Sequence, residues 1–387
     1  ELYEAEVERY GNRTIGGFLR MVGAEMPMTS DQVIWSEQNR LHIAYKSCTV
    51  AAPGGLPDAD ITLTIDLAVA QPDVAAADRR GAIRQGQTVL ISDNATGLIV
   101  QNDRVVGVKI GGEELYADAV ILASGGFEAN DALRVKHMGP DWAAAKVRGT
   151  PHNTGDGLVM ALQAGAAEYG LYSGCHATPM DLHMKNYGGL DLEPGERKNY
   201  RKICYFLGIM INANGKRFLD EGKNFRNYTY AQYGRKVLEQ PRHFAWQIFD
   251  SKVFDLLYEE YTFHDAHFVE ANTLKELIDK MDGIDKNETQ KTLDEYNKSI
   301  DEETVFDPTI LDGKSTQGLK IKKSNWAQTL DKGPYRAYPV TGGITFTYGG
   351  LKVDENGRVL KSDDIPIKGL FACGELVGGV FFNGYPG

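Results

Sequence analysis

The sequence contains few cysteines and no Cys-x-x-Cys pair. Iron–sulfur clusters, c-type haem and zinc knuckles need such spacing, so none of them is expected and no metal site is predicted. The four cysteines are far apart: Cys48, Cys175, Cys204 and Cys373. Scattered single cysteines are typical of a reducing compartment, which predicts a cytoplasmic protein.

Long apolar runs and a surplus of positive charge are also missing. No stretch of about 18 apolar residues occurs, so no membrane span is expected. The formal net charge of −11 disfavours nucleic acid as a partner. The same charge repels anionic ligands at long range, so a site for an organic acid would need cations close by.

Glycine is abundant, and it is densest in residues 369–387, GLFACGELVGGVFFNGYPG. Residues 369–373 are predicted to form a short buried strand that runs into Gly374 and Glu375. Glycines at this density let a backbone lie against a flat or anionic ligand, because no Cβ intervenes. The Glu375 carboxylate can accept hydrogen bonds from ligand hydroxyls; a glycine-rich turn without a ligand is the alternative.

A second glycine turn, Ser-Gly-Gly at residues 124–126, follows an apolar run at 119–123 that predicts a buried strand. Upstream of it, Asn102 and Asp103 predict the turn of a β-hairpin. Downstream, Thr-Gly-Asp-Gly predicts the start of a helix, with Asp156 as its N-cap rather than as a chemical group.

The middle of the chain, about residues 181–330, has a largely helical pattern and is predicted to be an inserted domain. Its first part contains Asn214 and Gly215, which predict a hairpin whose second strand is residues 217–219. Further on, Thr273 is predicted to cap a helix.

A resemblance to a known family rests on the C-terminal segment. The sequence IPIKGLFACGE at 365–375, preceded by GGLKVD at 349–354, resembles a flavoprotein family. That family comprises soluble fumarate reductases, succinate dehydrogenase flavoprotein subunits, L-aspartate oxidase and 3-ketosteroid dehydrogenases. The ending FFNGYPG is most similar to the branch of FAD-dependent tricarballylate dehydrogenases.

The resemblance implies FAD as the cofactor and an α/β fold. An FAD-binding domain of the glutathione-reductase (Rossmann) type would carry an inserted α+β capping domain. The implied boundaries are 1–180 and 331–387 for the FAD-binding domain and 181–330 for the cap.

Three of the glycine-containing segments quoted above correspond to FAD-contacting parts of that family. The glutamate after Cys-Gly binds the ribityl chain, the Ser-Gly-Gly turn lies beside the dinucleotide, and the Thr-Gly-Asp-Gly helix lies on the flavin side. The residues implied to contact FAD are Ser124, Gly125, Gly126, Asp156, Gly374 and Glu375. The two glycine turns are therefore expected to meet in space.

The family's Gly-x-Gly-x-x-Gly, which receives the pyrophosphate at a helix N-terminus, does not occur in this sequence. The family also continues beyond the point that corresponds to residue 387. The chain is therefore expected to be an internal fragment, cut at both ends, of a longer flavoprotein.

Three cationic positions of the fumarate reductases fall on aromatic residues here. The catalytic arginine falls on Phe254, a histidine on Phe346 and a second arginine on Tyr385. These replacements argue against fumarate reduction by the usual proton relay. The Tyr-Pro-Gly at 385–387 is similar instead to 3-ketosteroid dehydrogenases, in which the tyrosine polarises a carbonyl beside the bond being desaturated.

A tyrosine phenol, with a pKa near 10, serves at neutral pH as a hydrogen-bond donor. We expect Tyr385 to polarise a substrate carboxyl or carbonyl group, so that a base removes a proton and hydride passes to the flavin. The base is unresolved among Glu221, Arg226 and His176, of which the first two correspond to the family's proton-feeding pair. Tyr385, Glu221 and Arg226 are the expected catalytic residues; a packed aromatic is the alternative for Tyr385.

The substrate expected from the resemblance is a small polycarboxylic acid such as tricarballylate. Its binding residues are expected to be His176, Arg148 and Thr347, with Arg336 as a further cation. The prediction is an FAD-dependent dehydrogenase that desaturates a CH–CH bond next to a carboxylate, with an unknown electron acceptor. A 3-ketosteroid dehydrogenase, a fumarate-reductase-like flavoenzyme and a non-catalytic fragment without flavin are the alternatives.

Overall fold

The computed structural model describes residues 49–51, 62–64, 94–185, 187, 199–382 and 384–385. The chain divides into two compact units, residues 1–91 and 92–387. In the first unit the structure describes β1 (Thr49–Ala51) and β2 (Thr62–Thr64), which pair antiparallel. The other described elements belong to the second unit, and Cys48 lies outside the described residues.

One six-stranded sheet combines strands from both ends of the second unit. Its members are β3 (Ala95–Gln101), β4 (Arg104–Ile110), β5 (Glu113–Tyr116), β6 (Val120–Leu122), β15 (Arg358–Leu360) and β16 (Pro366–Ala372). The β3–β4 hairpin confirms the predicted turn, because Asn102 and Asp103 both adopt positive φ, at 50° and 59°. β16 lies parallel to β6, with Leu370 opposite Val120, so the segments that follow these strands leave the same sheet edge.

Strand β6 is buried on one face only. Val120 and Leu122 join the core of this sheet, whereas the side chain of Ile121 is 67% exposed. The prediction of a strand buried throughout is therefore wrong at Ile121. An apolar run shows that a strand forms, but it does not show whether other elements cover both faces.

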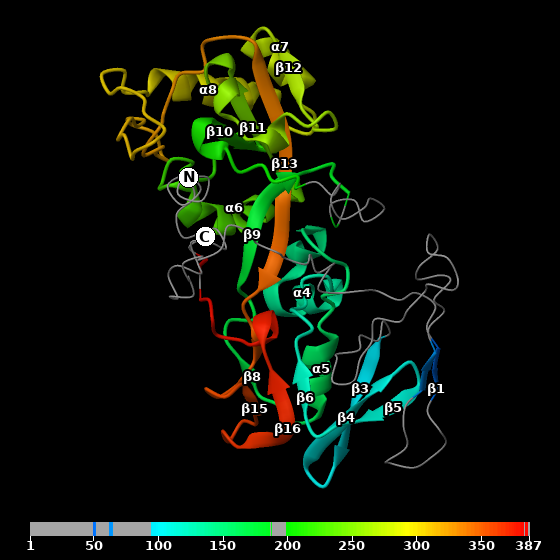
Figure 1. Ribbon diagram of the computed structural model, residues 1–387. Coiled ribbons are helices and arrows are strands. Elements are labelled where there is room, and N and C mark those ends of the chain that lie inside the picture. The colour runs from blue at the N-terminus through cyan, green and yellow to red at the C-terminus, as the bar shows by residue number, and fades with distance from the viewer. Residues whose placement is uncertain are drawn as a thin grey trace, which may run out of the picture. The chain divides into compact units, whose positions relative to one another are not determined.

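The second six-stranded sheet is built around β13 (Tyr335–Thr347), which runs through its length (Figure 1). Its other members are β7 (Lys146–Val147), β9 (Cys175–Asp181), β10 (Ile209–Asn212), β11 (Phe244–Asp250) and β12 (Val269–Ala271). β11 pairs with residues 335–341 of β13, and β9 pairs with residues 340–347. One strand thus connects the end of the unit that holds β12 to the end that holds the glycine turns.

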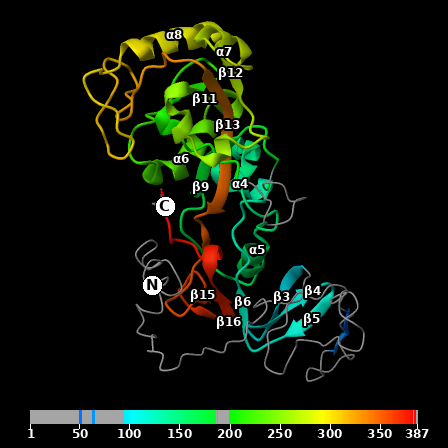
Figure 2. The ribbon, with the colours of Figure 1, turned by 45° about the horizontal axis from the view of Figure 1, so that its top comes forward.

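The α-helices of the described residues are α4 (Asp131–Met138), α5 (Asp156–Gln163), α6 (Arg226–Leu238), α7 (Leu274–Lys280) and α8 (Lys286–Lys298). Short 3-10 helices are η2 (Pro140–Ala144), η4 (Tyr205–Leu207), η5 (Pro241–His243), η6 (Ser251–Leu256), η7 (Glu259–Tyr261) and η8 (Gly374–Leu376). Two further strands, β8 (Glu168–Tyr169) and β14 (Gly350–Leu351), pair antiparallel. Figures 1 and 2 show α7 and α8 near β12, and α6 beside β9 and β13.

Helix α6 packs closely on β9 and β13 because glycine removes a side chain from the contact. A Cβ at Gly234 of α6 would lie 2.5 Å from the backbone oxygen of Thr178, and a Cβ at Gly342 of β13 would lie 2.3 Å from the backbone oxygen of Gly234. Such distances exclude larger residues. The close packing holds the second half of α6 against the sheet.

Two N-caps, those of α7 and α5, were predicted from the sequence. Thr273 caps α7 in a capping box with Glu276, as predicted. At α5 the prediction is wrong by one residue, since Gly155, with φ of 80°, occupies the N-cap and Asp156 is the first helical residue. The Asp156 carboxylate instead accepts a hydrogen bond from the Thr154 hydroxyl at 2.6 Å.

The turn predicted at Asn214 and Gly215 is confirmed, since Gly215 has φ of 73° and its N–H donates to the Asn212 oxygen at 2.9 Å, but the strand predicted after it is wrong. Residues 217–219 form no strand, and the partner of β10 is β11, with Ile209 opposite Ile248. All seven residues of β11 are buried and most of them are apolar. Arg217, in contrast, forms a buried ion pair with Glu221. Pairing with β11 therefore buries more apolar surface.

The proposed domain boundary after residue 180 falls within a sheet. β9 ends at Asp181 and shares its sheet with β10, β11 and β12 through β13. The limits 181–330 of a capping domain stay a prediction. No helix of the described residues is long and apolar enough to cross a membrane.

Candidate functional site

The two glycine turns lie against each other, as expected. The backbone N–H of Cys373 donates to the backbone oxygen of Leu122 at 3.0 Å, which joins the ends of β16 and β6. A Cβ added at Gly126 would lie 2.2 Å from Glu375 Oε1. The chain thus brings together two segments that are far apart in sequence, at one edge of the sheet.

Two carboxylates meet at this edge, and we call Glu128 and Glu375 the carboxylate pair. Glu375 Oε1 accepts from the backbone N–H of Thr347 at 2.7 Å and lies 3.3 Å from its hydroxyl. The Asn153 amide bridges the pair, since Nδ2 donates to Glu128 Oε1 and lies 3.4 Å from Glu375 Oε2. Burial, and after it the negative charge of Glu375, raise the pKa of Glu128 to about 8.

Several buried polar atoms around this edge and along the end of β13 have no hydrogen-bond partner among the described residues. They are Glu128 Oε2, His176 Nδ1, Thr345 Oγ1 and the Tyr348 hydroxyl. Buried polar atoms are nearly always paired, so such a group of atoms is typical of a ligand site. Gly374, with φ of 72°, has no atom within 4 Å of the point where a Cβ would stand, which leaves room beside the carboxylate pair. The hydroxyls of a ribityl chain, which both donate and accept hydrogen bonds, can pair with such atoms.

The remaining residues expected to contact FAD lie at the start of α5 and in the first glycine turn. A Cβ at Gly157 of α5 would be 2.0 Å from the Ser124 hydroxyl oxygen, so Ser124 touches the first turn of the helix. Asp156 in that turn is exposed. Gly125 has φ of 74°, and a Cβ there would be 2.6 Å from Asn153. The structure therefore groups all six of these residues around the carboxylate pair and α5.

A second group of side chains lies on the other side of the end of β13. We call it the aromatic cluster: His176, Tyr230, Phe346, Phe381 and Tyr385. The His176 ring stacks on Phe346 with centroids 5.1 Å apart and meets the Tyr385 ring edge-on at 5.0 Å. Tyr385 also contacts Phe346 at 5.3 Å and Phe381 at 5.2 Å.

His176 is the polar member of this cluster that is most deeply buried, with 2% of its surface exposed. Burial, followed by the charges of Arg148 and Arg201, lowers the pKa of His176 to about 4. The imidazole is therefore neutral at neutral pH. A neutral ring with an unpartnered Nδ1 can accept a proton or a hydrogen bond from a ligand.

Three arginines, which we call the arginine group, lie around Tyr230: Arg148, Arg201 and Arg226. The Arg226 guanidinium lies over the Tyr230 ring, 5.4 Å from its centroid, and all three charges act on the Tyr230 phenol. Arg201 Nη2 pairs with Glu260 Oε1 at 2.6 Å. The guanidiniums of Arg148 and Arg226 form no ion pair with another described residue, and burial, then repulsion by Arg201, lowers the pKa of Arg148.

Arg201 is a residue that sequence reasoning missed. The basic run around it has the pattern of a solvated face, yet Arg201 is only partly exposed and Lys202 is completely buried. Nothing in the local sequence distinguishes such a run from a surface one. The distinguishing contact, with Glu260, comes from a distant segment.

The end of β13 separates the two groups of side chains. Phe346 and Tyr348 both contact Phe381 and face the aromatic cluster, whereas Thr347 between them contacts Glu375. Successive residues of a strand point to opposite faces, which explains this alternation. Thr347, expected to bind substrate, is thus placed beside the carboxylate pair.

Two other expected residues lie elsewhere. The Glu221 carboxylate is buried in an ion pair with Arg217, whose Nε donates to Oε1 at 3.1 Å, and Oε1 also accepts from Met210 N–H at 2.8 Å. Arg336 is ten strand positions from Phe346 on β13, roughly 30 Å away at about 3.3 Å per residue. Its guanidinium lies 4.3 Å from the centroid of Phe254 and pairs with Glu270.

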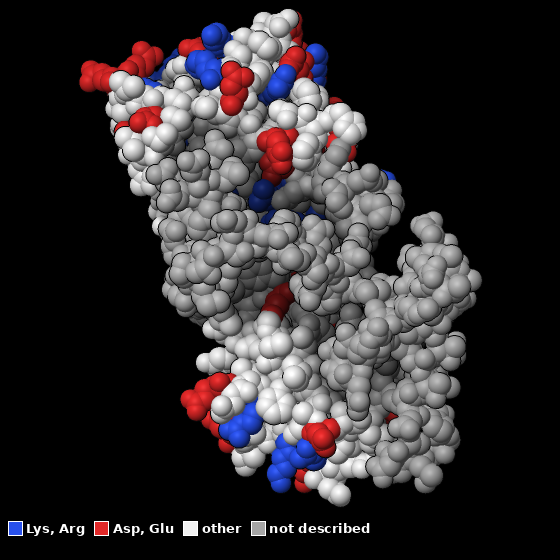
Figure 3. Space-filling model, in the orientation of Figure 1, with Lys and Arg blue, Asp and Glu red and all other residues white. Residues whose placement is uncertain are grey.

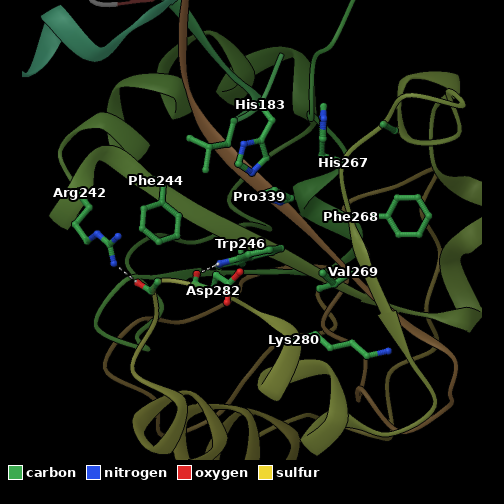
Figure 4. A pocket seen from close by; sticks show the side chains of 13 residues that line it. His183, Arg242, Phe244, Trp246, His267, Phe268, Val269, Lys280, Asp282 and Pro339 are labelled. Atoms are coloured by element: carbon green, nitrogen blue, oxygen red, sulfur yellow. Dashed lines mark hydrogen bonds between the residues drawn. The ribbon is translucent and has the colours of Figure 1, made fainter. Parts of the chain in front are cut away.

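A cavity of about 630 Å³ opens on the β11 side of the second sheet (Figure 4). His183 and His267 face it, and the Trp246 indole at its floor donates to the backbone oxygen of Asp282. None of the residues expected from the sequence to form the site lines this cavity. Among the described residues, no three His, Cys, Asp or Glu side chains come together as metal ligands would.

The described charges on one face are mixed in sign. Figure 3 shows Lys, Arg, Asp and Glu side chains gathered over α7, α8 and β12, and again over β15 and β16. The arginine group is therefore a local concentration of positive charge in a chain with a net charge of −11. Such a local group is what an organic acid needs in an otherwise repulsive field.

Comparison with known proteins gives a family and a fold. Residues 50–387 match the family described as "FAD binding domain". The 3-oxosteroid 1-dehydrogenase of Mycolicibacterium smegmatis is 28% identical over 341 residues, which cover 80% of this chain and 57% of that protein. The fumarate reductase (cytochrome) of Shewanella frigidimarina is 30% identical over 297 residues, covering 76% of this chain and 46% of that protein.

Among solved structures, the open conformation of a flavocytochrome c3 fumarate reductase is similar, with a TM-score of 0.56 and 24% identity. The match covers 74% of this chain and 47% of that one, and it shows a shared fold. The chain spans about half the length of these curated relatives.

Proposed function

The chain belongs to the FAD binding domain family, and on that basis we propose that it is part of a flavoenzyme that desaturates a CH–CH bond. The cofactor is FAD. The bond we propose lies next to a carboxylate in a polycarboxylic acid such as tricarballylate. FAD, when bound, supplies the acceptor for the hydride.

On the cofactor side, Glu375 would receive ribityl hydroxyls, with Thr347 N–H fixing its orientation. Gly125, Gly126 and Gly374 would let the cofactor approach the backbone. Ser124 and Asp156 would border it at the first turn of α5. The unpartnered Oε2 atom of Glu128 supports this assignment, because it lies at the same edge, beside Gly126.

On the substrate side, the arginine group would hold the carboxylates by charge-assisted hydrogen bonds. Tyr385 would donate its phenolic hydrogen to the carboxyl group next to the reacting carbon. This withdraws electrons and acidifies the adjacent C–H bond. The aromatic cluster would exclude water from the reacting atoms.

Of the three candidates for the base, His176 is supported best. Its Nδ1 is neutral and unpartnered, next to Tyr385. The Glu221 carboxylate is held by Arg217 and Met210, and the Arg226 guanidinium has hydrogen-bond donors but no acceptor atom. A catalytic role for Glu221 stays a prediction.

The arginine group around Tyr230, whose ring lies 6.4 Å from that of Tyr385, is the observation that carries the polycarboxylate proposal. We would test it with the full-length flavoprotein, mixed without oxygen with tricarballylate or with a 3-ketosteroid, while the visible absorbance of the flavin is followed. Bleaching by tricarballylate alone is expected. Bleaching by the steroid, or by neither compound, contradicts the proposal.

A 3-ketosteroid dehydrogenase is the second candidate. Tyr385 within an aromatic cluster, and the 28% identity to a 3-oxosteroid 1-dehydrogenase, favour it. The arginine group disfavours it, because a steroid offers no carboxylates to compensate the half-buried guanidiniums of Arg148 and Arg226. Residues 181–330 are proposed to form the cap over the substrate, and the cytoplasmic location stays a prediction.

A further inference from the structure

Glu128 is buried in a place where a charged carboxylate is costly. Only 3% of its surface is exposed, and Oε2 has no partner among the described residues. Its Oε1 accepts a hydrogen bond from a neutral amide, that of Asn153. A buried carboxylate without a cation or several N–H donors is stabilised by keeping its proton.

The neighbouring Glu375 increases this cost. Both carboxylates approach Gly126, where a Cβ would lie 2.2 Å from Glu375 Oε1 and 2.8 Å from Glu128 Oε2. Two carboxylates that share one site do not both ionise, and the pair holds one proton. We place the proton on Glu128, because its Oε2 has no donor, whereas Glu375 Oε1 accepts from the backbone N–H and the hydroxyl of Thr347.

The other charged and titratable groups that face Glu128 among the described residues do not change this balance. Arg134 on α4 donates to the backbone oxygen of Glu128 and to Asp131, so its charge is engaged away from the Glu128 carboxylate. The Cys175 thiol on β9 has a pKa that burial raises to about 12, so it stays neutral.

We propose that Glu128 is a positioning residue for FAD, which carries a proton at neutral pH and offers the cofactor a hydrogen-bond donor at Oε2. The inference rests on the FAD site but not on the identity of the substrate. Glu128 was not among the residues expected from the sequence. When Glu128 loses its proton, two negative charges lie beside each other, and Oε2 can no longer donate a hydrogen bond to FAD. FAD binding should therefore weaken.

The test is FAD affinity as a function of pH, measured without substrate on the full-length protein after removal of its flavin. Between about pH 6 and pH 9, wild-type affinity should fall about tenfold per pH unit above the Glu128 pKa of about 8. In Glu128→Gln, an uncharged mimic of the protonated acid, affinity should stay near the wild-type value at pH 6 and be independent of pH. Glu113→Gln, an exposed change on β5, is the matched control and should follow wild type.

A Glu128→Gln variant that loses affinity with pH as wild type does would overturn the proposal. Should that variant not fold, infrared spectroscopy of the wild type with labelled glutamate decides instead. A carboxylic-acid band at neutral pH that disappears with a midpoint near pH 8 supports the proposal, and its absence refutes it. A protein that binds FAD as described but leaves tricarballylate unchanged would contradict only the proposed substrate.

Discussion

Glu375 and Gly126 are in contact across the two glycine turns, with Glu375 Oε1 only 2.2 Å from where a Cβ on Gly126 would stand. The next two nearest atoms, Thr347 Oγ1 at 2.3 Å and Glu128 Oε2 at 2.8 Å, also belong to side chains. Side chains rotate away at less cost than backbone moves. A side chain at residue 126 should therefore displace the Glu375 carboxylate, while the chain still folds.

Gly126→Ala should fold and yet bind FAD poorly. We expect a change in the free energy of unfolding of about 1–2 kcal/mol, and at least a tenfold loss of FAD affinity because the Glu375 carboxylate is displaced. Denaturant unfolding and flavin-fluorescence titration measure the two quantities. Gly97→Ala on β3 is the control, since the nearest atom to its Cβ is Lys109 Cδ at 3.7 Å; normal affinity in the Gly126→Ala variant would disprove the assignment.

Tyr385→Phe should slow flavin reduction by substrate by roughly 10²- to 10³-fold, the usual effect of removing one hydrogen-bond donor from a developing anion. The aromatic contacts of Tyr385 with His176 and Phe381 are retained by phenylalanine. Stopped-flow absorbance without oxygen measures the step. Tyr228→Phe, at an exposed position of α6, is the control; equal rates in the Tyr385→Phe variant and the wild-type enzyme would leave Tyr385 as a packing residue.

Arg148→Gln should weaken substrate binding and change the neighbouring imidazole. Losing one charge-assisted contact should raise KM roughly tenfold to a hundredfold with a smaller change in kcat. The pKa of His176 should rise above its present value of about 4, because the Arg148 charge is the largest cause of its lowering after burial. NMR of labelled histidine measures that pKa without turnover, and an unchanged value would mean that the guanidinium lies too far away to act.

The buried neutral His176 should make stability depend on pH. Its folded-state pKa of about 4 lies below the ordinary value of 6.5, so the unfolded state binds more protons between those values. Stability is therefore complete above about pH 6.5 and falls as the pH drops toward 4, by roughly 3 kcal/mol in all. Denaturant unfolding at several pH values should show this loss in wild type and a reduced loss in His176→Phe.

Glu221→Gln should destabilise the protein by about 3–5 kcal/mol, because it leaves the Arg217 guanidinium buried and uncompensated. Adding Arg217→Met should recover most of that loss. Flavin reduction in the properly folded fraction should be nearly normal. The opposite result, normal stability with slow reduction, would favour the catalytic role that the family resemblance implied for Glu221.

Local signals in the sequence were enough to predict local structure. The positive φ of Asn102 and Asp103 follows from residue types that tolerate it, and the Thr273 cap needs only Glu276 three residues later. The contact between the glycine turns was also predictable, from the family resemblance. Most of the expected site residues do gather around the carboxylate pair or the aromatic cluster.

Contacts between distant segments could not be predicted in the same way. Residues 217–219 have a strand-like pattern, but the competing partner of β10 lies much further along the chain, in β11. The proposed role of Glu128 depends on its position beside Glu375, and the burial of Arg201 depends on its ion pair with Glu260. In each case burial and partner, rather than residue type, decide the role.

Strand β13 has a consequence for how this chain tolerates changes in length. Phe346 and Thr347 serve opposite faces, so deleting one residue between Val340 and Ile344 would turn every later side chain over. The phenyl ring would then be presented to Glu375, and the hydroxyl to His176. Natural variation and engineered insertions should therefore be confined to connecting segments, and β13 should keep a fixed length wherever both of its faces serve the site.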